Sequence, residues 1–192
     1  SHAAMPQQSK DTILVASYLV NQLQSIVSRN VAPLDSCVLS ITELQAGCAY
    51  NVLPETGHVG GTVRYFKDEV YNLVRNRMQR ICDGIASVYE VQIDLNMRNV
   101  FDVLVNDDHL SDAYLSAAED ILGSANVSDT SLPATGSEDF ADMLRVVPGA
   151  YCRVGHTGTT GLHNPGFILG QEVLSIGASI MARVVEKRLH LS

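Results

Sequence analysis

The stretch Val91-Gln92-Ile93-Asp94-Leu95-Asn96-Met97-Arg98 decides the fold class, because its apolar and polar side chains alternate without exception. Alternation with a period of two is typical of a β-strand that buries one face and exposes the other. Two further stretches, at residues 37–45 and 57–66, also predict strands. We therefore expect a sheet to which residues 91–98 contribute the last strand in this half of the chain.

Apolar residues recur at helical spacing before and after the first two of these strands. The spacing predicts helices over residues 10–29 and 68–88, which gives the order α-β-β-α-β up to residue 98. A split β-α-β fold has the order β-α-β-β-α-β. The first half is therefore predicted to have this ferredoxin-like fold without its first strand.

The second half of the chain is predicted to be mainly helical, with one short strand and a Gly-, Thr- and His-rich loop at residues 155–166. A boundary near residues 99–106 separates the two halves, and the fold class is α+β. The helices of the second half are expected at residues 107–122, 138–146 and 171–190, and its strand at residues 150–154.

Composition excludes several classes of protein. Of the 192 residues 46% are hydrophobic, so the chain is a globular protein and not a disordered one. A net charge of −8 without a basic stripe argues against nucleic-acid binding. No apolar run is long enough to span a membrane. The four cysteines are scattered without a paired motif, which indicates reduced thiols and a cytoplasmic protein.

Two short stretches of the second half carry side chains that can do chemistry. His163 lies in Gly-Leu-His-Asn-Pro, where it is either a metal ligand or a surface histidine, and its spacing from His156 fits no common metal motif. Glu138 and Asp139 open a predicted helix after Ser137, where carboxylates also suit the helix dipole. The residues alone do not name a reaction.

Several motifs taken together resemble the metal-dependent aminoacylase and carboxypeptidase family, in its amidohydrolase branch acting on hippurate and N-acetyl amino acids. The first of them, SHAAMP at residues 1–6, resembles the family's Gly-x-x-His-Ala-Ala-x-Pro stretch. The others, in chain order, are AYNVLPE at residues 49–55, GTVR at 61–64, GSEDF at 136–140, VPGA at 147–150 and GLHNP at 161–165.

The resemblance implies a division into domains. Residues 1–100 would be a lid and dimerisation domain that is incomplete at its N-terminus. Residues 101–192 would be the C-terminal α/β portion of the catalytic domain. The partners implied are a small N-acyl amino acid and a second copy of the chain, which would join through the lid.

The resemblance also assigns roles to single residues. His163 matches the family's last metal ligand, at a centre of two divalent ions, zinc or manganese. His2 matches a catalytic histidine that reaches the partner's active site and stabilises the developing oxyanion. Asn51 matches a substrate-binding asparagine, and Arg64 matches the arginine that grips the substrate carboxylate. Glu138 and Asp139 would position groups beside the site.

Two family motifs are absent from these 192 residues, the His-x-Cys-Gly-His-Asp segment and the Glu-Glu pair that supplies the general base. The chain therefore resembles part of an amidohydrolase of about twice its length, and by itself it is expected to be inactive. The alternatives are a non-catalytic module for dimerisation and ligand binding, and an autonomous α+β binding module.

Overall fold

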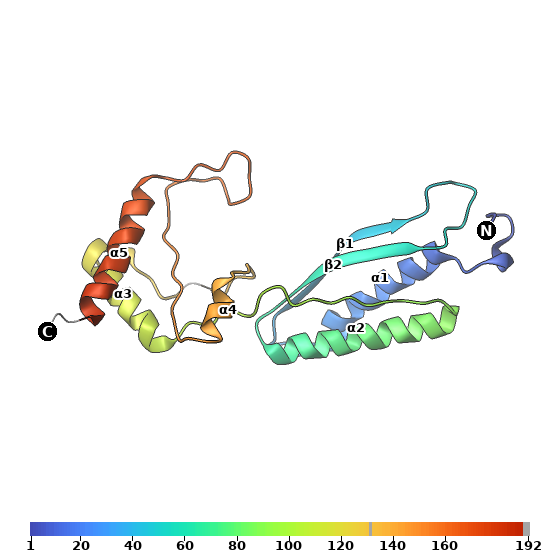
Figure 1. The fold of residues 1–192 in the computed structure, drawn as a ribbon, viewed down its shortest axis with the longest axis horizontal. Coiled ribbons are helices and arrows are strands. Elements are labelled where there is room, and N and C mark those ends of the chain that lie inside the picture. The colour runs from blue at the N-terminus through green and yellow to red at the C-terminus, as the bar shows by residue number, and fades with distance from the viewer. Residues whose placement is uncertain (131, 190–192) are drawn as a thin grey trace. The chain divides into compact units, whose positions relative to one another are not determined.

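Two antiparallel strands and two long helices make up the first of two units, Ser1–Val103 (Figure 1). The computed structural model describes residues 1–130 and 132–189. In this unit a short 3-10 turn, η1 (Pro6–Gln8), precedes the larger elements. These are α1 (Thr12–Arg29), β1 (Cys37–Ala46), β2 (Gly57–Tyr65) and α2 (Asp68–Tyr89), all close to their predicted bounds.

The core of this unit lies between the two helices and the strands. Ile26 of α1 and Val74 of α2 are fully buried, and Leu39 of β1 is buried from the sheet side. The helical spacing seen in the sequence therefore predicts the correct buried faces. The other buried members of this cluster are Val15, Leu19, Leu23, Val70, Cys82 and Ile85.

The two strands pair in antiparallel register, with Cys37 opposite Tyr65 and Ala46 opposite Gly57. The register shifts between Ile41 and Glu43, where β1 carries a bulge. Gly61 lies against this stretch, and a Cβ atom on it would approach the carbonyl oxygen of Ser40 to 2.2 Å. Only glycine allows the two strands to lie this close.

Residues 91–98 do not form the predicted third strand. The segment is extended and its exposure alternates as the sequence predicts, with Val91, Ile93, Leu95 and Met97 packed against the core. In the described part of the chain no strand is hydrogen-bonded to it, so the sheet has two strands. The alternation identified the buried face but could not identify a partner for the backbone.

The second unit, Leu104–Ser192, contains helices and irregular segments in its described residues. The helix predicted over residues 171–190 ends at Arg188, and His190 lies outside the described residues. None of the described helices of either unit has the length and apolar character needed to cross a membrane. The elements of this unit are α3 (Asp108–Leu122), η2 (Ser124–Asn126), α4 (Phe140–Leu144) and α5 (Glu172–Arg188).

The strand predicted at residues 150–154 is absent, so the α/β character expected of this half is not seen among the described residues. A side chain takes the place of a neighbouring strand. The Asn106 side-chain oxygen accepts a hydrogen bond from the Tyr151 amide at 2.8 Å, and its amide group donates to the Tyr151 carbonyl at 2.9 Å. Both backbone groups of Tyr151 are therefore hydrogen-bonded, although in the described structure no strand pairs with this segment.

Charged side chains join α3 to α5 on the surface of the second unit. Asp120 accepts hydrogen bonds from Arg183 at 2.8 Å and from Lys187 at 2.9 Å. Lys187 also donates to the hydroxyl of Ser116 at 2.6 Å. The hydrogen bond from Lys187, and after it the one from Arg183, lower the pKa of Asp120 from its ordinary value.

We expect Ile26→Ala to destabilise the first unit by about 2–5 kcal/mol, because it removes a fully buried side chain and leaves a cavity. Ile13 lies in the same helix but is 46% exposed, so Ile13→Ala is the matched control and should cost about 1 kcal/mol or less. Urea unfolding followed by circular dichroism measures both. Equal losses would show that the core does not lie where the structure places it.

Asp120→Asn tests the link between α3 and α5 through its dependence on pH. Because the pKa of Asp120 is lowered in the folded state, its contribution is present above the unfolded pKa of about 3.9. It is lost as the pH falls through the lower, folded pKa. The variant should therefore unfold at lower urea than wild type at pH 7, and the difference should shrink in acid. Asp112→Asn, on an exposed site of α3, should show no such difference.

Candidate functional site

A short antiparallel pairing brings together two of the predicted site residues, His2 and Asn51. His2 forms an isolated bridge with Val52, the amide of Ala3 donates to the carbonyl of Asn51 at 2.9 Å, and the amide of Leu53 donates to Ser1 at 2.9 Å. Both predicted residues are exposed. Spacing in the sequence could not predict this contact, since the two residues are 49 positions apart.

The ring of His2 is held in one tautomer. Its Nδ1 accepts a hydrogen bond from the amide of Ala4 at 3.0 Å. In a neutral imidazole one nitrogen accepts and the other carries the proton, so the proton lies on Nε2. The exposed ring therefore presents an N–H donor, which is the form that can stabilise negative charge on an oxygen.

Neighbouring contacts fix the loop that carries Asn51. The hydroxyl of Thr12, at the start of α1, donates to the carbonyl of Pro54 at 2.9 Å. Gly47 has a φ of 74°, a conformation that favours glycine, and lies against Pro54 and Ile13. The loop between β1 and β2 is thus attached to the first turn of α1, and it holds the pairing with residues 1–3.

Arg64 lies at the other end of the hairpin. It is exposed on β2 opposite Val38, on the face away from the core-facing Val63. Arg64 is seven positions after Gly57, where the loop ends and β2 begins, and at about 3.3 Å per residue this is roughly 23 Å. Within one chain the length of β2 therefore separates Arg64 from the loop that carries Asn51.

His163 has an unusual backbone conformation. Its φ is 67°, and it is one of two residues other than glycine with positive φ among the described residues. The amide of Phe167 donates to the carbonyl of Asn164 at 2.9 Å, which closes a turn directly after His163. Left-handed backbone at a non-glycine residue costs about 1–3 kcal/mol and is concentrated at functional sites. This observation is independent of the sequence motif.

His156, in contrast, has a structural role in the same loop. Its Nδ1 accepts a hydrogen bond from the amide of Gly158 at 3.0 Å. Its ring meets that of Phe167 edge-on, with 5.2 Å between the centroids. These contacts join the two ends of the loop and agree with the interpretation of His156 as a loop histidine.

Glu138 and Asp139 precede α4, as the sequence predicts. Asp139 occupies the N-cap position without a side-chain hydrogen bond to the helix. Desolvation and then a hydrogen bond to Glu138 raise the pKa of the Tyr151 phenol. Tyr151 therefore anchors Glu138, and Asn106 holds the backbone of Tyr151. Nothing in the sequence pointed to either of these two residues.

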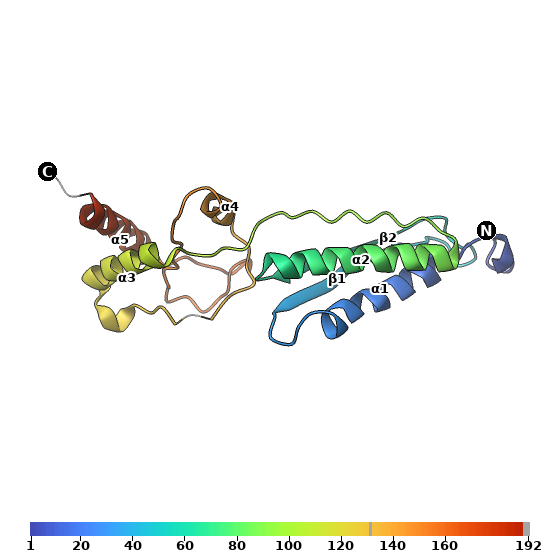
Figure 2. The same cartoon turned by 90° about the horizontal axis from the view of Figure 1, so that it is seen from below.

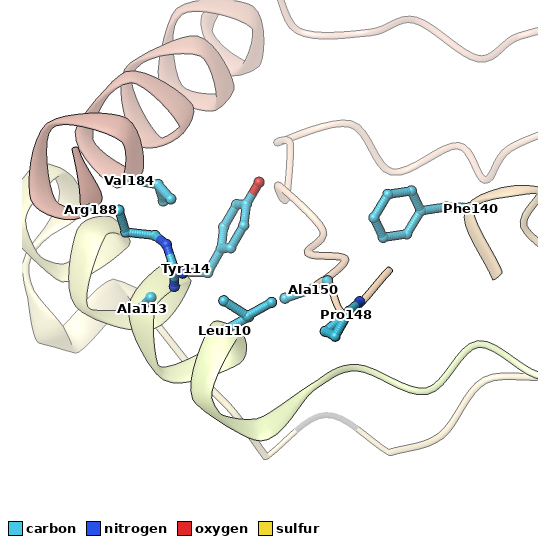
Figure 3. A pocket seen from close by; sticks show the side chains of 9 residues that line it. Leu110, Ala113, Tyr114, Phe140, Pro148, Ala150, Val184 and Arg188 are labelled. Atoms are coloured by element: carbon cyan, nitrogen blue, oxygen red, sulfur yellow. The ribbon is translucent and has the colours of Figure 1, made fainter. Parts of the chain in front are cut away.

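An open depression of about 340 Å³ lies between α3, α5 and residues 148–150 (Figure 3). It contains none of the predicted catalytic, substrate-binding or metal-binding residues. The side chains of Leu110, Tyr114, Phe140, Pro148, Val184 and Arg188 line it.

The described residues do not form a metal centre by themselves. Nowhere in residues 1–130 and 132–189 do three His, Cys, Asp or Glu side chains gather where they could hold one ion. Within these described residues His163 is therefore a candidate ligand without a complete set of partners.

Two curated proteins are similar to this chain over nearly all of its length. Hippurate hydrolase of Campylobacter jejuni is 33% identical over 188 residues, which are 98% of this chain and 49% of that protein. N-acetylcysteine deacetylase of Bacillus subtilis is 36% identical over 95% of this chain and 47% of its own length. The chain thus spans about half the length of the curated relatives it matches.

Solved structures and a family profile agree with these relatives. A putative aminohydrolase from methicillin-resistant Staphylococcus aureus superposes with a TM-score of 0.82 at 25% identity, over 99% of this chain and 50% of that one. A dinuclear metal-binding M20 peptidase of Bacillus subtilis gives a TM-score of 0.76 at 29% identity, over 93% of this chain and 46% of its own. The profile of Peptidase family M20/M25/M40 matches residues 7–187. The resemblance seen in the sequence motifs is therefore confirmed, and the chain belongs to the M20/M25/M40 peptidase family.

Proposed function

We propose that this chain is part of a metal-dependent amidohydrolase that cleaves the amide bond of N-acyl amino acids, of the hippurate or N-acetyl kind. The support comes from relatives named hippurate hydrolase, N-acetylcysteine deacetylase and N-acetyldiaminopimelate deacetylase. Because the chain spans half of their length, we assign the activity to a full-length protein and propose that the 192-residue chain alone is inactive.

The observation that carries this proposal is the pairing that sets His2 beside Asn51, with the proton of His2 on Nε2. As the amide is attacked, negative charge develops on its carbonyl oxygen. An N–H donor aimed at that oxygen binds the transition state more tightly than the substrate. We assign this role to His2 and assign substrate contact to Asn51.

We propose that the first unit is the lid and dimerisation domain, with a split β-α-β fold that lacks its first strand. The order of its elements and the core-facing side of residues 91–98 support this assignment. His2 and Asn51 would then complete the active site of the partner in a homodimer. The four cysteines are free thiols in the structure, which supports the cytoplasm as the proposed location.

We assign the second unit to the C-terminal portion of the catalytic domain. It buries few apolar side chains among its described residues, namely Ala117, Ala141 and Ile180, while Val146 and Ile168 are about four-fifths exposed at 82% and 79%. Exposed apolar side chains of this kind support an assignment in which the rest of a larger domain covers them. Glu138, held by Tyr151, and Asp139 are proposed to position groups beside the site.

We propose two divalent ions, zinc or manganese, in the full-length protein. The residues of this chain do not fit such a centre alone, since no cluster of three ligands occurs among those described. His163, which the loop holds in a left-handed conformation, is the one ligand we assign here. The other ligands and the general base belong to the other half of the protein.

His2→Ala in a full-length protein that contains this chain should lower kcat for hippurate and N-acetyl amino acids by about 10²-fold or more, the effect of losing one oxyanion donor. KM should change little. His109→Ala, at an exposed site on α3, is the matched control and should leave kcat unchanged. Release of the free amino acid measures both, and near-wild-type kcat for His2→Ala would contradict the assignment.

Arg64→Ala should raise KM by about tenfold or more for a substrate with a free carboxylate, because a guanidinium binds a carboxylate through two parallel hydrogen bonds. The matched substrate is the same N-acyl amino acid with its carboxylate converted to an amide, for which KM should not change. Equal effects on both substrates would exclude Arg64 as the carboxylate-binding residue.

A further inference from the structure

The bridge between His2 and Val52 is too small to hold its own geometry. Both residues are exposed, and two backbone hydrogen bonds of 2.9 Å flank the bridge. A backbone hydrogen bond contributes only about 0.5–1.5 kcal/mol, and exposed ones open most readily. The direction of the His2 Nε2–H therefore depends on what holds the two segments of the bridge, residues 1–3 and 51–53.

Both segments are attached to the beginning of α1. In Figure 2, as in Figure 1, the first residues, the loop between β1 and β2 and the start of α1 lie at the same end of the first unit. The hydroxyls of Ser1 and Ser9 are 2.6 Å apart, which joins residues 1–3 to the residue that closes η1. The side chain of Asp11 accepts a hydrogen bond from the Leu14 amide at 3.0 Å and so fixes where the helix begins.

Thr12 attaches the second segment through both branches of its side chain. Its hydroxyl donates to the carbonyl of Pro54 at 2.9 Å and lies 3.3 Å from the carbonyl of Glu55. Its methyl group lies close to Gly57, since a Cβ atom on that glycine would be 3.0 Å from it. Serine in place of Thr12 would keep the hydrogen bond without the methyl group, and valine would keep the methyl group without the hydrogen bond.

Burial makes Thr12 the stronger of the two attachments. The hydrogen bond from Thr12 to Pro54 is partly buried, whereas the one between Ser1 and Ser9 is exposed to solvent. Water competes less with a partly buried hydrogen bond, and a carbonyl left unpaired there costs more. We therefore expect the loop to move most when Thr12 loses its hydroxyl.

We propose that Thr12 is a positioning residue for His2, and that its hydroxyl sets the direction of the His2 Nε2–H through the loop and the bridge. The inference rests on the proposed role of His2 as the oxyanion donor. Because that donor stabilises charge that develops only in the transition state, a misdirected donor lowers kcat more than it raises KM. A misplacement of about 1 Å can cost roughly 10²-fold in rate.

Amide hydrogen exchange, measured by NMR on this chain, tests the link between Thr12 and the bridge without catalysis. Thr12→Val should make the amides of Ala3 and Leu53 exchange at least about fivefold faster, and Thr12→Ser should leave them at the wild-type rate. Ser17→Ala is the matched control, because the Ser17 hydroxyl donates to the Ile13 carbonyl within the same helix and not to the loop. It should leave both amides unchanged.

Kinetics of a full-length protein that contains this chain test the link to His2. Thr12→Val should lower kcat for hippurate by about tenfold with a smaller change in KM, and Thr12→Ser should restore most of the wild-type kcat. In a His2→Ala background Thr12→Val should lower kcat no further, since a residue that acts only through His2 has nothing left to position. A merely structural role for Thr12 would lower kcat in both backgrounds.

Unchanged exchange of the Ala3 and Leu53 amides in Thr12→Val would overturn the proposal before any activity is measured. Additive losses of kcat from Thr12→Val and His2→Ala would overturn it as well. Wild-type kcat for His2→Ala is a separate result, because it contradicts the proposed function while the exchange rates still show whether Thr12 positions His2.

Discussion

The first unit depends on burial of the apolar faces of α1 and α2, which pack against each other and against the two strands. Ile26 and Val74 are fully buried because the strands close over them. Burial of side chains of this size stabilises a fold by about 1.5–3 kcal/mol each. The same packing fixes the first turn of α1, where Thr12 holds Pro54 and with it the loop that carries Asn51. The position of His2 therefore depends on the core through the loop and not on any contact of its own with the core.

The second unit depends on polar contacts to a greater degree. Asp120 joins α3 to α5, and the Asn106 side chain satisfies both backbone groups of Tyr151. Few of its described apolar side chains are buried. Directional contacts can hold segments in place where the apolar surface remains open, which supports the proposal that this unit is one part of a larger catalytic domain.

The sequence predicted helices and core faces well because a period of 3.6 or 2 reports burial directly. It predicted strands at residues 91–98 and 150–154 wrongly, since a strand also needs a neighbour and periodicity contains no information about one. The candidate residues came from motifs. The structure adds the backbone pairing of residues 1–3 with residues 51–53 and the strained backbone of His163. The link from Asn106 through Tyr151 to Glu138 had no sequence signal, because it joins residues far apart through side-chain geometry.

The length of the β1–β2 hairpin has a consequence for the proposed dimer. Arg64 and the pair His2 and Asn51 lie at opposite ends of it, roughly 23 Å apart along β2, which is longer than an N-acyl amino acid of the hippurate kind. One substrate cannot touch both ends of the same hairpin. If all three residues serve one reaction, each protomer contributes to both active sites of the dimer. Its arginine binds the substrate in one active site, and its histidine completes the other. A dimer of one protomer that lacks Arg64 and one protomer that lacks His2 would then contain one intact active site.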